Sequence, residues 1–157
     1  MSDTRKFGLV PMEIWRTTDN LELFQQMAAG ELPAPRIAET LDFQVVEVER
    51  GRVVFSGEPK SNYYNPAGAV HGGYIGTLLD SAMSCAVQST LAAGKAMTTL
   101  EFKVSFVRPV FEKTGIVLAE GIVLNAGKQI ATAEGKLVDA NGKLYAHATT
   151  TCMIFNL

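Results

Sequence analysis

Apolar residues recur with a helical period in the stretch from residue 72 to residue 94, which opens with Gly72-Gly73. Their i, i+3, i+4 and i+7 spacing predicts a helix with one face on the core. The stretch contains no Lys, Arg or Glu, and Asp80 is its only charged residue. A charged side chain is rarely buried unless it is paired or functional. Asp80 is therefore a candidate functional residue, with a solvated residue on the helix surface as the alternative.

Alternating or continuous apolar positions predict strands on both sides of this helix. Two strands precede it and four follow it, at residues 43–49, 52–57, 99–107, 116–124, 129–138 and 144–154. In the first strand after the helix, Phe102, Val104 and Phe106 share one face. Short turns such as Arg50-Gly51 and residues 139–142 predict antiparallel neighbours.

The N-terminal part of the chain has a different pattern of apolar and polar residues. Residues 1–18 show no clear period, whereas Asp19-Asn20 can cap a short helix that ends at Gly30. Prolines 33 and 35 then mark a connector. We therefore divide the chain into an N-terminal helical extension, residues 1–40, and a main domain, residues 41–157.

This order of elements predicts an α+β fold in which an antiparallel sheet wraps around one long central helix. Strands of about ten residues can twist around such a helix and keep one face on the core. A single helix and a single sheet leave sheet edges exposed, and oligomerisation commonly covers them.

Composition narrows the function classes. The 157 residues are 47% hydrophobic and 19% charged, which predicts a globular protein. A net charge of −2 without a basic run argues against nucleic-acid binding. We expect no signal peptide and no membrane span, and hence a cytoplasmic protein. Cys85 and Cys152 form no CxxC pair or metal-ligand cluster, so we interpret them as buried thiols rather than as nucleophiles.

One motif is more specific. The string Asn65-x-x-Gly68-x-x-His71-Gly72-Gly73, with Asp80 nine residues after the histidine, resembles the hotdog-fold thioesterases of the phenylacetic acid degradation (PaaI) type. The strand that ends at Arg108-Pro109, and the turns at residues 127–128 and 139–142, are similar to that family as well. The resemblance covers roughly residues 40–155.

The resemblance implies hydrolysis of acyl-coenzyme A thioesters. Asp80 would be the catalytic carboxylate, acting as nucleophile or as general base, and the peptide N–H of Gly72 would polarise the thioester carbonyl. Asn65 and His71 would position the substrate, and Thr99 would hold the attacking water. No cofactor is implied, because coenzyme A is part of the substrate.

Five further residues are candidates for substrate binding. Gly73 would allow close approach to the backbone, and Ser84 either assists Asp80 or permits close helix packing. Tyr64 lies in the loop expected to line the acyl pocket. Arg108 and Lys128 suit coenzyme A phosphates, although solvated charges are an equal alternative.

Helix geometry bears on how the site is assembled. Gly72 and Asp80 are eight residues apart, so along one helix they lie roughly 12 Å apart. An antiparallel helix from a second subunit can bring the two groups to one carbonyl. We therefore expect a homodimer with shared active sites, assembling further into a tetramer.

Two other functions stay open at this point. A hotdog-fold hydratase or dehydratase would also act on acyl thioesters, but its motif places Asp before Asn-Pro and a His closer behind. Here Tyr64 precedes Asn65, and five residues separate Asn65 from His71. The third reading is a non-catalytic module that binds acyl thioesters.

Overall fold

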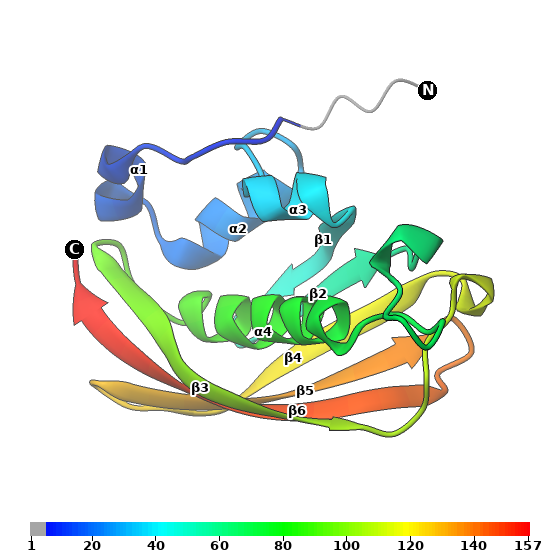
Figure 1. The fold of residues 1–157 in the computed structure, drawn as a ribbon. Coiled ribbons are helices and arrows are strands. Elements are labelled where there is room, and N and C mark those ends of the chain that lie inside the picture. Colours follow the sequence, from blue (N-terminus) through cyan, green and yellow to red (C-terminus); the bar gives the residue numbers. More distant parts are fainter. Residues whose placement is uncertain (1–5) are drawn as a thin grey trace.

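Six strands form one antiparallel sheet that curves around a long helix in the computed structural model, which describes residues 6–157 (Figure 1). The helix is α4 (Gly72–Gln88). The sheet order is β1-β2-β4-β5-β6-β3, with strands β1 (Phe43–Glu49), β2 (Arg52–Gly57), β3 (Lys95–Phe106), β4 (Val117–Ala126), β5 (Ile130–Asp139) and β6 (Leu144–Asn156). This architecture confirms the α+β hotdog fold predicted from the sequence.

The inner face of α4 packs directly on the sheet. Ala82 and Met83 are completely buried there, opposite Gly121 on β4 and Gly135 on β5. A Cβ atom at Gly121 would lie 2.3 Å from the backbone carbonyl carbon of Ala82, far inside van der Waals contact. Glycine at this position therefore lets the helix backbone approach the strand and fixes the depth at which α4 sits.

Helix α4 ends at Gln88, earlier than the expected end at Gly94, and β3 begins at Lys95 rather than at residue 99. Side chains at the end of the helix explain both differences. The Ser89 hydroxyl accepts a hydrogen bond from the backbone N–H of Gly51 at 2.9 Å. Gln88 Oε1 accepts one from the backbone N–H of Met97 at 2.9 Å. These contacts end the helix at Gln88 and allow the strand to begin at Lys95.

Three short helices, α1 (Met12–Thr17), α2 (Asn20–Ala28) and α3 (Arg36–Thr40), lie over α4 on the side away from the sheet (Figure 1). The predicted helix after Asp19 is confirmed as α2. Neither α1 nor α3 was predicted. Helix α3 starts directly after Pro35, because the fixed φ angle of proline suits a helix start as well as a connector.

A buried polar cluster joins this N-terminal layer to the main fold. The amide of Asn20 donates hydrogen bonds to the carbonyls of Leu91, Ala92 and Lys95 at 3.0–3.2 Å, and its oxygen accepts one from Gln88 at 2.8 Å. Because Asn20 is completely buried, these bonds satisfy groups that would otherwise be costly. The division of the chain at residue 40 stays a prediction.

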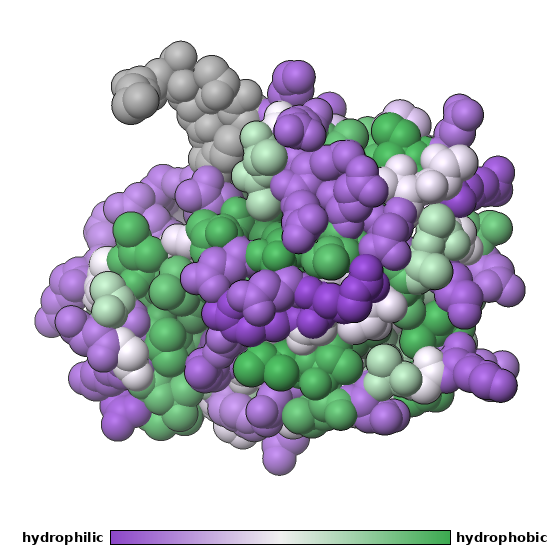
Figure 2. Space-filling view, turned by 180° about the vertical axis from the view of Figure 1, so that it is seen from behind, coloured by the Kyte–Doolittle hydropathy of each residue, from purple (hydrophilic) through white to green (hydrophobic). Residues whose placement is uncertain are grey.

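Strand β3 is an edge of the sheet, and none of its residues is buried. Leu100, Phe102 and Phe106 are each more than 40% exposed, although the neighbouring β6 alternates between buried and exposed positions. On the face seen from behind, hydrophobic residues reach the surface in separate areas divided by hydrophilic ones (Figure 2). Within residues 6–157, no helix has the length and apolar character needed to cross a bilayer.

Candidate active site

The site begins at the N-terminus of α4, where His71 caps the helix. Its Nδ1 atom accepts a hydrogen bond from the backbone N–H of Gly73 at 2.9 Å. The first N–H groups of a helix have no acceptor within the helix, and among the described residues none accepts from the N–H of Gly72. The cap therefore occupies the N–H of Gly73 and leaves that of Gly72 available for a ligand.

A groove follows the outer face of α4 from Gly72 to Asp80, with β3 as its second wall. The ring of Phe106 lies over Gly72, where an added Cβ atom would come within 2.9 Å of it. Phe102 lies in the same way over Gly76, at a looser 3.6 Å. The helix backbone thus forms the floor of the groove, and two exposed aromatic rings cover it.

Asp80 is half-buried in this groove and has one side-chain partner. The Thr99 hydroxyl donates a hydrogen bond to Asp80 Oδ1 at 3.0 Å. Burial raises the pKa of the Asp80 carboxyl, and the hydrogen bond from Thr99 partly opposes that increase. A carboxylate with a raised pKa and an oriented hydroxyl neighbour has the properties of a general base or a nucleophile.

A β-bulge places Thr99 on the helix side of β3. The pairing of β3 with β6 shifts between Thr99 and Glu101. In an unbroken strand, Thr99 and Phe102 would point to opposite faces, because side chains alternate. Here both face α4, since the bulge inserts one residue between them.

Asn65 and Arg108 border a second hollow, which meets the groove at Gly72 and Phe106. The Asn65 side-chain oxygen accepts hydrogen bonds from the backbone N–H groups of Ala67 and Ala69 at 2.9 and 3.3 Å. Its oxygen therefore shapes the loop before α4. Arg108 is exposed and donates to the carbonyl of Leu144 at 2.6 Å.

The remaining candidates lie outside the groove and the hollow. The Tyr64 hydroxyl accepts a hydrogen bond from the backbone N–H of Glu112 at 2.8 Å, at the start of the short η2 helix (Glu112–Thr114). Ser84 donates to the carbonyl of Ser81 on its own helix. Lys128 is exposed in the turn between β4 and β5. The roles predicted for these residues stay predictions.

The sequence did not indicate the apolar walls of the groove, which include Phe102, Phe106 and Ile37 of α3. The alternation in β3 placed the two phenylalanines on one face, but a strand pattern usually indicates a buried face. Ile37 gave no signal because α3 was not predicted.

The described residues offer no metal centre and no disulfide. No three His, Cys, Asp or Glu side chains within residues 6–157 come together in a way that could hold a metal ion. Cys152 is buried and Cys85 is partly buried, and both are free thiols. Burial raises the pKa of both thiols, which disfavours the reactive thiolate.

The chain has relatives among known proteins with thioesterase or hydrolase names. A phenylacetic acid degradation-related protein from Ralstonia eutropha is 32% identical and superposes with a TM-score of 0.75, covering 83% of this chain and 98% of its own. A 1,4-dihydroxy-2-naphthoyl-CoA hydrolase from Listeria monocytogenes is 25% identical over 118 residues, which are 75% of this chain and 94% of that protein.

A third relative, from Streptococcus mutans, was solved bound to acetyl-CoA. It is 25% identical, with a TM-score of 0.66, and the match covers 73% of this chain and 89% of that protein. These matches confirm the resemblance to PaaI-type thioesterases. The model of the thioesterase superfamily matches residues 67–146, which include His71, Asp80 and Thr99. The chain therefore belongs to the thioesterase superfamily.

Proposed function

We propose that this protein hydrolyses acyl-coenzyme A thioesters to the free acid and coenzyme A. One observation carries the proposal: half-buried Asp80, held by Thr99, and Gly72, whose N–H has no acceptor among the described residues, lie along the same outer face of α4 beside the edge strand β3. A carboxylate and an N–H donor at a helix N-terminus are the two groups that attack on a thioester carbonyl requires.

The chemistry follows from these two groups. As general base, Asp80 takes a proton from water, whose oxygen attacks the carbonyl carbon. As nucleophile, its own oxygen attacks, and water then cleaves the resulting anhydride. In both routes the carbonyl oxygen becomes negative, and the Gly72 N–H stabilises it with help from the dipole of α4. The carbon–sulfur bond breaks, and coenzyme A leaves as the thiolate and takes up a proton.

We assign the two groups of one reaction centre to different subunits. Gly72 and Asp80 lie at opposite ends of one groove, roughly 12 Å apart along α4. Strand β3 is a twelve-residue edge without a buried residue, which a second copy would cover. In an antiparallel dimer, Gly72 of one protomer would face Asp80 of the partner subunit.

A second interface would turn the dimer into the expected tetramer. The outer face of the sheet exposes apolar side chains, including Ile122, Leu124, Ile130 and Met153. These side chains are candidates for that interface, since clustered apolar surface commonly marks an interaction site. Sedimentation of the wild-type protein distinguishes the dimer from the tetramer.

Coenzyme A as the thiol part of the substrate is supported by the two relatives that act on or bind coenzyme A thioesters. In this chain Arg108 is exposed beside the Asn65 hollow, where a phosphate could pair with its guanidinium. Lys128 lies in a separate turn, and we keep it only as a secondary phosphate contact.

The direct experiment is release of free thiol from a panel of acyl-CoAs by the wild-type protein and by Asp80→Asn. We expect turnover by the wild type and its loss in the variant. Binding of acyl-CoA without thiol release would indicate a binding module, and water addition to an enoyl-CoA would indicate a hydratase. A single turnover with excess enzyme in ¹⁸O-water then tests for the nucleophilic route in which water opens the anhydride at Cγ of Asp80, because only that route gives an unlabelled first acid and places the label on Asp80.

A further inference from the structure

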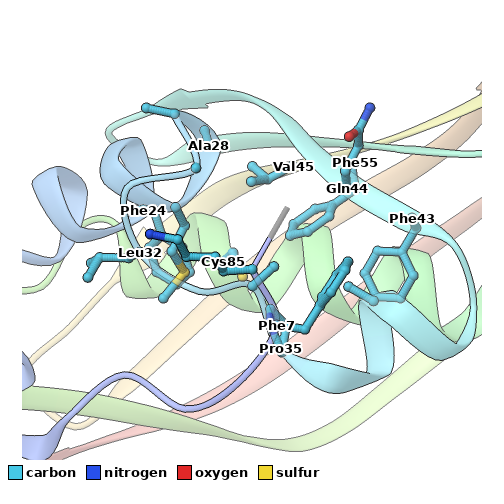
Figure 3. Close-up of a pocket in the computed structure, with 16 residues that line it drawn as sticks. Phe7, Phe24, Ala28, Leu32, Pro35, Phe43, Gln44, Val45, Phe55 and Cys85 are labelled. Atoms are coloured by element: carbon cyan, nitrogen blue, oxygen red, sulfur yellow. The ribbon is translucent and has the colours of Figure 1, made fainter. Parts of the chain in front are cut away.

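A second pocket, open to solvent at its rim, lies between the N-terminal layer and the main fold (Figure 3). The cavity has a volume of about 280 Å³ and is lined from α2, α3, α4, β1, β2 and the segment before α1. Of the described residues that line it, only Lys6 and Gln44 carry a charged or amide side chain. Its walls are otherwise apolar, and include Phe7, Phe24, Leu32, Phe43, Phe55 and Cys85.

Cys85 of α4 borders this pocket. Protein atoms surround the thiol, and this burial raises its pKa to about 12. Cys85 nevertheless keeps part of its accessible surface. The accessible part of Cys85 can therefore report whether the pocket is occupied.

The size and lining of the cavity point to an apolar occupant. An apolar cavity of about 150 Å³ stays dry and binds benzene, so a space of about 280 Å³ could hold an apolar group of roughly eleven carbons. An unfilled cavity is unfavourable for folding, because the atoms that line it lose packing contacts. An apolar ligand that filled this pocket would restore those contacts.

The cavity and the Asp80 groove share two walls. On α3, Ile37 borders the groove and the adjacent Ala38 borders the cavity. On α4, Ser81 borders the groove and Cys85, one helical turn further, borders the cavity. Asp80 and Cys85 are roughly 7.5 Å apart along the helix axis. A chain of several carbons bound at Asp80 is long enough to span this separation.

We propose that the cavity under the N-terminal helices binds the hydrocarbon tail of a medium-chain acyl group whose thioester lies at Asp80. This inference rests on the proposed function for the identity of the substrate. It assigns chain-length selectivity to α2, α3 and the segment around Phe7, elements that lie outside residues 67–146. The tail would pass from the groove into the cavity between Ile37 and Ser81.

The test is a substitution at the rim of the pocket that reduces its free volume. Ala28 lines the cavity but is exposed at the end of α2, so Ala28→Phe adds a ring there without displacing a buried side chain. Gln25→Phe is the matched control, because Gln25 is exposed on the same helix and does not line the cavity. The ratio of kcat/KM for octanoyl-CoA to that for acetyl-CoA should fall about tenfold or more in Ala28→Phe, the effect typical of lost apolar contacts. It should stay within about twofold of wild type in Gln25→Phe.

A binding measurement separates this inference from hydrolysis. Octanamide, an uncharged analogue of the product, should bind the wild-type protein and Gln25→Phe, and bind Ala28→Phe about tenfold more weakly. In the wild type it should also slow modification of Cys85 by methyl methanethiosulfonate, followed by mass spectrometry of the Cys85 peptide. This last readout needs no variant.

The outcomes are distinct. Octanamide binding with protection of Cys85, but no hydrolysis of any acyl-CoA, would leave the cavity assignment standing and overturn the proposed function. Hydrolysis with an unchanged selectivity ratio in a folded Ala28→Phe, or octanamide binding without protection of Cys85, would overturn the cavity assignment alone.

Discussion

The two faces of α4 use glycine in opposite ways. On the sheet side, the glycines belong to the strands, and Gly121 brings β4 against the backbone of Ala82 in a completely buried contact. On the outer side, the glycines belong to the helix, and Gly72 and Gly76 meet the rings of Phe106 and Phe102. Those rings are 57% and 41% exposed.

On the sheet side the position of the α4 backbone must be fixed, whereas on the outer side a substrate must be able to reach the helix. The sheet side has no room for an added atom, so the position of the α4 backbone, and with it the N–H of Gly72, is set by packing. The outer side is covered by side chains that can rotate away. A substrate can therefore approach a rigid helix N-terminus from the groove, while the sheet holds that terminus in place.

The largest expected effect concerns the outer face. Asp80→Asn should lower kcat for thioester hydrolysis by at least about 100-fold, because the amide can neither accept a proton nor attack a carbonyl. The substitution preserves shape, so circular dichroism and sedimentation should match the wild type. A folded Asp80→Asn protein with near-normal turnover would remove Asp80 from the mechanism.

The next effect is on the sheet face and concerns stability. Gly121→Ala should lower the free energy of unfolding by about 1–3 kcal/mol, because its Cβ has no room beside Ala82. Gly76→Ala is the matched control on the outer face, where the new Cβ would lie 3.6 Å from Phe102. It should raise the free energy of unfolding by about 0.5–1 kcal/mol, since alanine favours a helix interior.

Urea denaturation followed by circular dichroism measures both changes. If Gly121→Ala were as stable as the wild type, the contrast between the two faces would be wrong.

A smaller effect concerns pH. The ionised form of Asp80 is the reactive one, so kcat/KM should fall as the pH drops through its pKa, which burial raises above the ordinary value for aspartate. Thr99→Val removes the hydrogen bond that lowers this pKa, so the acid limb should move to higher pH. Profiles of kcat/KM against pH for the two proteins test this. A limb that moves to lower pH, or does not move, would contradict the role of Thr99.

Much of the fold was predictable because it rests on local patterns. The period of α4, the strand alternation and the turn at residues 139–142 each carry a direct signal in the sequence. Helices α1 and α3 were not predictable in this way, since they have six and five residues and no buried period of their own. The early end of α4 depends on contacts of Ser89 and Gln88 with distant residues.

The site was predictable as residue types but not as an arrangement. The motif around His71 and Asp80 identified both ends of the groove. Simple alternation in β3 would place Thr99 on the face of Glu101, and only the β-bulge turns it toward Asp80. The cavity also escaped prediction, because it forms between segments that are far apart in the sequence.

The central claim is that each reaction centre combines Gly72 of one subunit with Asp80 of the partner subunit. Mixing Asp80→Asn protein with Asn65→Ala protein tests it most directly, since each is expected to be inactive alone. About half of randomly exchanged dimers are mixed, and each has one intact site, so activity should return to about a quarter of the wild-type value. If mass spectrometry shows mixed dimers and no activity returns, the site lies within one subunit and the claim is wrong.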